Sequence, residues 1–148
     1  MLMSSILLPN MAAFRLLQWN ACGLAKRVEF KHHVALNAYD VICVQETWLQ
    51  PNKIYNLPGY DIIRRDRNVS QGGGVATFIR SGLQYTEIRN KFDIECLVVK
   101  LKSTSSYIHI INAYIPPNKI VKQDELKQLF SFPGCIITGD FNAKNPLW

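Results

Sequence analysis

The stretch that decides the fold is Gly134-Cys135-Ile136-Ile137-Thr138-Gly139-Asp140-Phe141-Asn142. A short apolar, β-branched run bounded by glycine is typical of a buried strand. Side chains alternate along an extended chain, so Asp140 and Asn142 are predicted to point to the same side. There, a carboxylate can bind a hard cation or accept a proton from water, and an amide can hydrogen-bond a phosphate oxygen. A strand followed by an ordinary Asp/Asn turn is the alternative interpretation.

Length and composition indicate one globular domain with a basic surface. The chain has 148 residues, of which 48% are apolar and 19% are charged, and this excludes a disordered polypeptide. Lysine and arginine number 17 against 11 acidic residues, which gives a formal net charge of +6. This charge favours a polyanionic partner such as DNA, although many basic proteins bind no nucleic acid.

The cysteines and the N-terminal residues indicate an intracellular protein. The cysteines lie far apart and form no C-x-x-C pair, so a zinc site is not expected. We predict that the strand cysteines Cys43, Cys96 and Cys135 are buried and that all four cysteines, Cys22 included, are unpaired. Pro9 and Asn10 interrupt the short apolar run near the N-terminus, and no basic residue precedes it, which argues against a signal peptide. No stretch approaches the ~20 apolar residues of a membrane span. We therefore predict a frayed tail over residues 1–13 and a domain over residues 14–148.

The pattern of apolar residues predicts an α/β fold. A strand over 14–19, a helix over 25–38 and a strand over 40–45 suggest a parallel crossover unit. A loop over 48–59 comes next. Further strands with short connections are typical of an antiparallel meander, and they are expected over residues 60–64, 75–79, 83–89, 94–102 and 107–115. A helix over 121–130 precedes the strand described first. We expect mixed sheets that are covered by helices.

Polar residues stand where several of these apolar runs stop. Asn20 ends the first strand, Glu46 follows the second, and Tyr114 lies near the end of another. Ligands of α/β sheets bind outside such strand ends. Each residue has its own structural alternative, since Asn20 could turn the chain, Glu46 could be a cap or a surface acid, and Tyr114 could pack. Together with Asp140 and Asn142 they predict one functional site.

The motifs that carry these residues occur in an order that resembles the endonuclease/exonuclease/phosphatase superfamily, which includes apurinic endonucleases. The motifs are Leu17-Gln18-Trp19-Asn20-Ala21-Cys22-Gly23-Leu24, Gln45-Glu46-Thr47, Asn112-Ala113-Tyr114-Ile115-Pro116-Pro117 and Gly139-Asp140-Phe141-Asn142. Two further stretches are similar to the endonuclease domain of non-LTR retrotransposons, in particular jockey-type elements. These are Arg65-Asp66-Arg67 with Gly72-Gly73-Gly74-Val75-Ala76, and Asn142-Ala143-Lys144-Asn145-Pro146-Leu147-Trp148.

The resemblance implies a four-layer sandwich with two central sheets and metal-dependent hydrolysis of a phosphodiester. Glu46 would hold Mg²⁺ or Mn²⁺, with Asn20 close to the metal and to the reacting groups. Tyr114 would donate to the phosphate. Asp140 would orient or deprotonate the attacking water, and Asn142 would contact the phosphate or the nucleophile. Few protein carboxylates and hard oxygen ligands suit Mg²⁺, and the metal would neutralise charge that develops on the phosphate.

Basic and glycine-rich stretches each allow two interpretations. Arg64, Arg65 and Arg67 are candidate contacts to DNA phosphates, with a solvated charge run as the alternative. Residues 72–74 either let the backbone approach DNA or turn the chain, and they are not a nucleotide-binding P-loop because no Lys-Ser/Thr follows. The histidines are expected to be structural or surface residues.

The resemblance covers residues 16–148 and departs from the family at its end, because the family's later Ser-Asp-His segment is not present. The chain therefore resembles the first two thirds of an endonuclease domain, incomplete at its C-terminal end and inactive alone. The full-length protein would nick DNA, with access to the nucleus, and a downstream reverse transcriptase would extend the 3′-hydroxyl. Alternatives are another superfamily phosphoesterase, a repair nuclease, or a non-enzymatic nucleic-acid-binding remnant. No membrane partner is expected, and the sequence does not indicate the oligomeric state.

Overall fold

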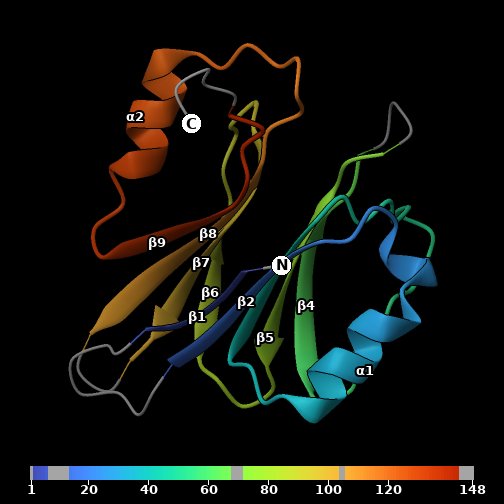
Figure 1. Cartoon of the computed structure of the whole chain (residues 1–148). Helices are drawn as coiled ribbons and strands as arrows, with labels where there is room; N and C mark the ends of the chain where they lie inside the picture. The colour runs from blue at the N-terminus through green and yellow to red at the C-terminus, as the bar shows by residue number, and fades with distance from the viewer. Residues whose placement is uncertain (1, 7–13, 68–71, 104–105, 144–148) are drawn as a thin grey trace.

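The computed structural model describes residues 2–6, 14–67, 72–103 and 106–143, which form two β-sheets and the helices that cover them (Figure 1). The first sheet has the strand order β1-β2-β3-β5-β4. Its strands are β1 (Leu2–Ile6), β2 (Phe14–Asn20), β3 (Val41–Gln45), β4 (Tyr60–Arg65) and β5 (Val75–Arg80). A 3₁₀ turn (Leu24–Lys26) and helix α1 (Val28–Leu36) connect β2 to its parallel neighbour β3. The predicted crossover unit is therefore confirmed.

The second sheet has the strand order β6-β7-β8-β9. Its strands are β6 (Tyr85–Ile88), β7 (Glu95–Lys102), β8 (Tyr107–Tyr114) and β9 (Cys135–Asp140), and helix α2 (Gln123–Phe130) connects β8 to its parallel neighbour β9. The predicted single meander is wrong in one respect, because β5 and β6 lie in different sheets. Both edges of β5 are already paired, with β3 and β4, so β6 cannot pair with the strand that precedes it, and it pairs with β7 instead.

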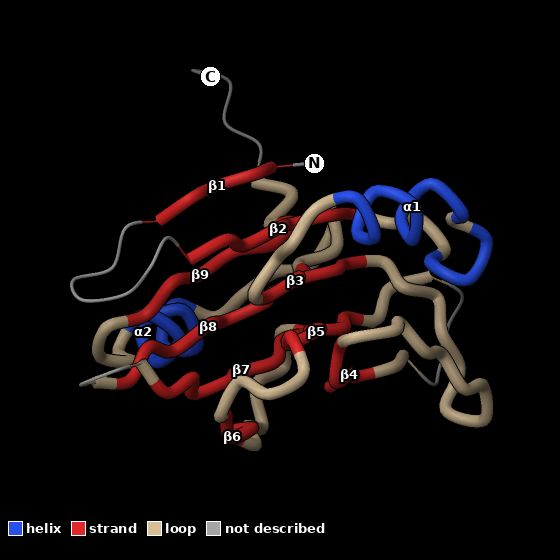
Figure 2. Tube along the Cα trace, turned by 90° about the horizontal axis from the view of Figure 1, so that it is seen from below, coloured by secondary structure: helices blue, strands red, loops and turns tan. Residues whose placement is uncertain are grey.

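Three hydrophobic clusters show that the molecule has four layers. One cluster lies between the sheets and joins residues such as Leu16 and Cys43 of the first sheet to Val99 and Ile110 of the second. A second cluster packs α1 on the outer face of the first sheet, and a third packs α2 on the outer face of the second. Figure 2 shows the two rows of strands with a helix outside each row. The expected α/β sandwich, with two mixed sheets flanked by helices, is confirmed.

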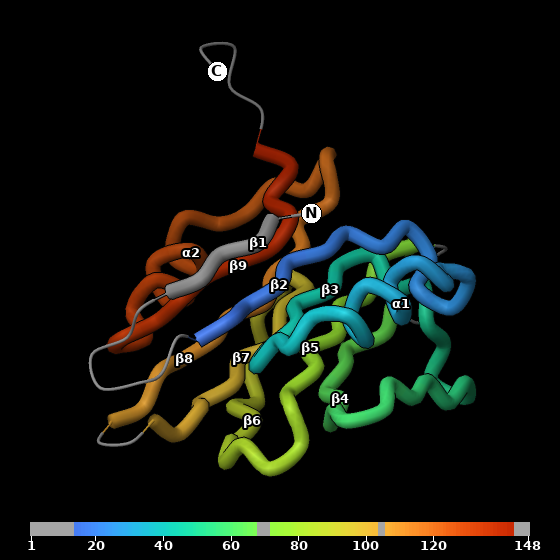
Figure 3. The backbone as a smooth tube through the Cα atoms, turned by 60° about the horizontal axis from the view of Figure 1, so that its bottom comes forward, coloured from blue at the N-terminus to red at the C-terminus, as the bar shows by residue number. Residues whose placement is uncertain are grey.

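The N-terminal residues differ from the predicted tail. Leu2–Ile6 form β1, which pairs with β2 in antiparallel register from Leu2 opposite Gln18 to Ile6 opposite Phe14. Figure 2 shows β1 beside β2 at the edge of the first sheet, and Figure 3 shows the other strands of that sheet in the order β2-β3-β5-β4. Backbone pairing explains the difference, because an open strand edge offers unpaired N–H and C=O groups to any extended segment whatever its sequence.

Buried amide side chains connect the two sheets. Gln18 of β2 donates to Gln45 of β3, and Gln45 Nε2 donates to Asn112 Oδ1 of β8 at 2.7 Å. Asn112 Nδ2 in turn donates to the carbonyl of Ala76 at 2.9 Å and to that of Val44 at 3.3 Å. Asn112 and Gln45 are fully buried. Because buried polar groups are costly unless they are paired, these bonds favour one relative position of the two sheets.

Replacing Asn112 by leucine is expected to destabilise the fold by about 2–4 kcal/mol, because the Gln45 amide and two carbonyls lose a buried partner. The melting temperature should fall by roughly 5–15 °C in a thermal unfolding experiment. Gln18→Met is the matched control, since it removes only the terminal amide of the network and should cost about 1 kcal/mol. Equal losses in the two variants would contradict a network centred on Asn112.

Candidate active site

The predicted site residues lie where two pairs of parallel strands end. In the first sheet Asn20 is opposite Gln45, the residue before Glu46, and in the second sheet Tyr114 is opposite Asp140. Side chains alternate along a strand, so Asn20 points to the same face of β2 as Leu16, and Tyr114 points to the same face of β8 as Ile110. Both Leu16 and Ile110 belong to the cluster between the sheets. Asn20 and Tyr114 therefore lie on the sheet faces that point toward each other, at the edge of the cluster between the sheets.

One amide group connects the two sheets at this place. Asn20 Nδ2 donates to Glu46 Oε1 at 3.1 Å and to Asp140 Oδ2 at 2.7 Å. The predicted proximity of Glu46 and Asp140 is therefore confirmed, although 94 sequence positions separate the two residues. Two carboxylates that share one neutral donor repel one another, and a bound cation would relieve this repulsion.

Tyr114 lies beside the two carboxylates. Burial, the charge of Glu46 and a hydrogen bond to that carboxylate together raise the pKa of its hydroxyl to about 12. The guanidinium of Arg67 acts in the opposite direction and lies 5.8 Å from the centre of the tyrosine ring. Tyr114 therefore carries its proton at neutral pH and can act as a hydrogen-bond donor.

Asn142 is held by the turn that follows β9. Its backbone N–H donates to Asp140 Oδ1 at 3.1 Å, and its side-chain amide donates to the carbonyl of Ile115 at 3.0 Å. The aspartate–asparagine turn that the sequence left as an alternative is therefore present, and it occurs within the cluster of site residues. Because Asp140 accepts bonds from Asn20 and from the Asn142 backbone, its carboxylate is held in one orientation.

Backbone strain is concentrated around the cluster, and no feature of the sequence had indicated it. Among the described residues, the non-glycine positions with positive φ are Cys22 at 44°, Glu46 at 50°, Trp48 at 54° and Asn142 at 44°. Such conformations cost about 1–3 kcal/mol each and are typical of functional sites. All four lie in the loops that follow β2, β3 and β9, so the strain coincides with the predicted site.

Cys22 is a neighbour of the site that sequence reasoning did not select. It is exposed, and its thiol lies 3.3 Å from Asn20 Oδ1 and 3.6 Å from Glu46 Oε2. Burial of the sulfur raises the pKa of this thiol, and the adjacent Glu46 carboxylate raises it further. Cys22 is therefore a protonated donor to Glu46 at neutral pH. No sequence signal identified it, because a single cysteine after a strand occurs in proteins of many different functions.

The three arginines proposed as DNA contacts all have partners within the protein. Arg64 binds the carbonyl of Gln50 at 2.9 Å and the carboxylate of Asp66 at 3.1 Å. Arg65 joins the two sheets by donating to the carbonyls of Phe92 and Ile94, each at 3.0 Å. These bonds position the arginines, and contact with DNA stays a prediction.

Arg67 and the glycine run belong to one hydrogen-bonded unit. Arg67 Nε donates to Glu95 Oε1 at 2.6 Å, and Glu95 Oε2 accepts the backbone N–H of Gly74 at 2.7 Å. The carbonyl of Gly74 accepts the N–H of Thr47 at 3.2 Å. The glycines therefore turn the chain and pack against the residues that follow Glu46, which is one of the two predicted alternatives.

Two of the histidines have structural partners, as expected. His33 Nε2 lies 2.8 Å from the hydroxyl of Tyr39, and His109 Nδ1 lies 2.7 Å from the carbonyl of Pro133. His32 is exposed on α1.

The four cysteines are unpaired, as predicted. Cys43 and Cys96 are buried, whereas Cys135 is only half-buried because it lies in β9, at the edge of the second sheet.

Buried thiols predict a loss of stability at alkaline pH. Burial raises the pKa of Cys43 from 9.0 to about 12 and that of Cys96 to about 11. The unfolded chain releases these protons first, so the stabilisation is complete below pH 9 and is lost as the pH rises towards 12. The free energy of unfolding should fall by about 1 kcal/mol per pH unit for each thiol.

Urea unfolding between pH 8 and pH 11 measures this slope. Cys43→Ala should remove the contribution of one strongly shifted thiol from the slope, whereas Cys22→Ala, whose exposed thiol has a smaller rise in pKa, should reduce the slope less. A stability that stays constant up to pH 11 would contradict the burial of these groups.

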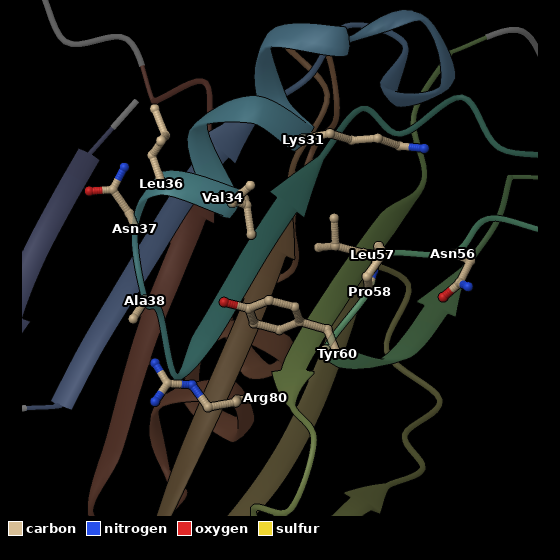
Figure 4. Close-up of a pocket in the computed structure, with 12 residues that line it drawn as sticks. Lys31, Val34, Leu36, Asn37, Ala38, Asn56, Leu57, Pro58, Tyr60 and Arg80 are labelled. Atoms are coloured by element: carbon tan, nitrogen blue, oxygen red, sulfur yellow. The ribbon is translucent and has the colours of Figure 1, made fainter.

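A separate pocket lies at the opposite end of the first sheet. It has a volume of about 700 Å³ and lies between α1 and the segment before β4 (Figure 4). Tyr60 and Arg80 line it, and both donate to the carbonyl of Tyr39, at 2.9 and 3.0 Å. None of the predicted site residues lines this pocket.

Two β-sheets packed face to face, with a carboxylate from each sheet at one end, define a four-layer α/β sandwich with a polar site at its edge. The chain belongs to the endonuclease/exonuclease/phosphatase family, whose model matches residues 17–148. Members of this family generally use divalent metals.

The chain is similar to part of a transposon protein. The probable RNA-directed DNA polymerase from transposon BS of Drosophila melanogaster is 26% identical over 146 residues, which cover 93% of this chain and 16% of that protein.

Solved structures with the same fold include the endonuclease domain of TRAS1, a telomere-specific non-LTR retrotransposon. Its TM-score is 0.68 at 18% identity, over 91% of this chain and 63% of that chain. A family protein from Leptotrichia buccalis has a TM-score of 0.65 at 16% identity, over 88% of this chain and 67% of that chain. The chain therefore spans less than two thirds of the TRAS1 domain and a small part of the transposon protein.

The residues of the cluster fit a divalent metal of the hard type. Among the described residues, no group of three or more His, Cys, Asp and Glu side chains converges. Two carboxylates, those of Glu46 and Asp140, do meet at the Asn20 amide, and few carboxylates suit Mg²⁺, which keeps several waters and shares oxygens of its substrate. Within the part of the chain that the structure describes, no helix is long and apolar enough to cross a membrane.

Proposed function

We propose that this chain is part of a DNA endonuclease that nicks one strand and leaves a 3′-hydroxyl. The observation that carries the proposal is the Asn20 amide bonded to both Glu46 and Asp140, because it brings one carboxylate from each sheet to a single point. We further propose that residues 14–148 form the first part of the catalytic domain and that a reverse transcriptase follows in the full-length protein. The work of such a protein on chromosomal DNA requires access to the nucleus.

Each residue of the cluster has a proposed role in hydrolysis. Asp140 accepts a proton from water, whose oxygen attacks the phosphorus atom, and the bond to the 3′-oxygen breaks. That oxygen takes a proton from solvent and leaves as the 3′-hydroxyl. Tyr114 donates to a non-bridging phosphate oxygen, and Asn142 contacts the phosphate or the attacking water. Glu46, with Asn20 beside it, would hold Mg²⁺ or Mn²⁺, and such a cation neutralises charge that develops on the phosphate.

Nicking of supercoiled plasmid in Mg²⁺ or Mn²⁺ tests the proposal. The longest natural reading frame that contains this chain is expected to convert supercoiled plasmid to open circles, with ends that a polymerase extends. We expect this chain alone to nick little, because it spans only part of the domains it resembles.

Alternative substrates distinguish this proposal from its rivals. Hydrolysis restricted to abasic-site DNA would instead indicate a repair nuclease, and hydrolysis of an inositol phosphate would indicate a different phosphoesterase. Salt-sensitive binding without cleavage in any metal would indicate a remnant that only binds nucleic acid.

A further inference from the structure

An exposed tryptophan stands beside the candidate active site. Trp48 is 51% exposed and follows Glu46 by two residues. Tyr107 and Phe130 are also exposed, but Tyr107 lies at the opposite end of β8 from Tyr114 and Phe130 ends α2. Among the residues that the structure describes, Trp48 is thus the large exposed aromatic residue nearest to the cluster.

The ring of Trp48 is held in place although it is exposed. Its backbone has a φ of 54°, and its N–H donates to the carbonyl of Gly73 at 3.0 Å. A Cβ atom built on Gly23 would lie 3.0 Å from Cε3 and 3.4 Å from Cζ3 of the indole. The six-membered ring therefore packs directly against the α-carbon of Gly23. Gly72 approaches the Nε1 edge, since a Cβ there would lie 3.6 Å away.

The support for this ring is bonded to the site itself. The N–H of Gly23 donates to the carbonyl of Glu46 at 2.9 Å, and the N–H of Leu24 donates to that of Thr47 at 2.9 Å. Gly23 also follows Asn20 by three residues. The indole is therefore fixed to the same two loops that present Asn20 and Glu46.

We propose that Trp48 is a substrate-contacting residue that stacks on an unpaired nucleobase next to the phosphodiester bound at Glu46 and Asp140. The inference rests on the proposed function, because the stacked base would belong to the DNA that is cleaved at the same site. A fixed aromatic face suits stacking because little side-chain freedom is lost on binding, and every nucleobase offers a face to it. The contact would favour DNA that is locally unwound or single-stranded, since a base within a duplex is covered by its neighbours.

DNA affinity measures this contact without any need for cleavage. Fluorescence anisotropy of a labelled 12-nucleotide single strand, in Ca²⁺ or EDTA, should show that Trp48→Ala weakens binding by about 10-fold, within the 5- to 150-fold range typical of one stacked base. Trp48→Phe keeps an aromatic face and should retain most of the affinity. Tyr107→Ala removes a similarly exposed ring far from the site and should change nothing.

A second measurement remains decisive if Trp48→Ala fails to fold. In a Trp19→Phe, Trp148→Phe background, Trp48 is the one tryptophan left of the 3 in the sequence. Its fluorescence should be quenched by the oligonucleotide and much less by a strand of tetrahydrofuran spacers, which has phosphates and sugars but no bases. Equal quenching by both strands, or equal affinities of Trp48→Ala and Tyr107→Ala, would overturn the inference.

The same experiments separate this inference from the proposed function. If the parent chain binds DNA with a steep salt dependence and Trp48→Ala binds equally well, the stacking contact is wrong and the endonuclease proposal stands. If the parent chain binds no DNA even at low salt, the stacking contact is wrong, and plasmid nicking by the longest reading frame still decides the endonuclease proposal.

Discussion

Replacing Gly139 by alanine is expected to cost more than about 4 kcal/mol and to prevent β9 from pairing with β8. Gly139 has a φ of 153° and lies opposite Ala113 in the parallel pair. A Cβ atom there would lie 1.8 Å from the carbonyl oxygen of Ala113 and 2.9 Å from its nitrogen. Both atoms belong to backbone, so no side chain can move aside to make room.

Gly82→Ala is the matched control for this prediction. Gly82 also has a positive φ, of 94°, but a Cβ atom there meets nothing within 4 Å. The control variant therefore carries the conformational strain without the collision and should lose about 1–2 kcal/mol. Thermal melts and soluble yield measure both variants. If Gly139→Ala melts within a few degrees of Gly82→Ala, the close approach of β9 to β8 is wrong.

The strands and the members of the site could be predicted because both leave local signals. Apolar runs ended at Asn20, Glu46 and Asp140, and each of these residues lies at a strand end in the structure. Parallel strands place their carboxyl ends together, which explains why Asn20 lies beside Glu46 and Tyr114 beside Asp140, whereas the meeting of these two pairs depends on how the sheets pack.

Features that depend on distant parts of the chain could not be predicted. The division of the strands into two sheets depends on which edges are already paired, and sequence periodicity does not contain that information. The sequence predicted only that Asn112 lies in a strand. Its hydrogen bond to Gln45, which connects the two sheets, depends on how the sheets pack. The support of Trp48 by Gly23 likewise needs two loops that are separate in sequence.

Arg65 has partners within the protein that the sequence did not indicate. Next to Arg64 and Arg67 it resembled part of a basic surface for DNA. In the structure its guanidinium binds two carbonyls of the segment before β7, so it joins the sheets. A run of charges reports composition, whereas the partner of each charge is fixed by tertiary packing.

In the nicking-competent protein, Asp140→Asn is expected to lower the nicking rate by about 10²–10⁴-fold at saturating Mg²⁺ or Mn²⁺. Asparagine keeps the shape of the side chain and cannot accept the proton of the attacking water. Glu46→Gln is expected to raise the metal concentration needed for half-maximal nicking, because the glutamine has lost the charge that attracts the cation. Glu87→Gln changes an exposed carboxylate on β6 and serves as the control that should nick at the parental rate.

The double variant tests whether Glu46 and Asp140 act as one unit. Because the Asn20 amide bonds to both carboxylates, removing the second charge after the first should cost much less than it does alone. Equal and fully additive losses would mean that the two carboxylates act independently, which contradicts a single site. Nicking that survives in all of these variants would come from a contaminating nuclease, and the parent preparation would then give no support to the proposed function.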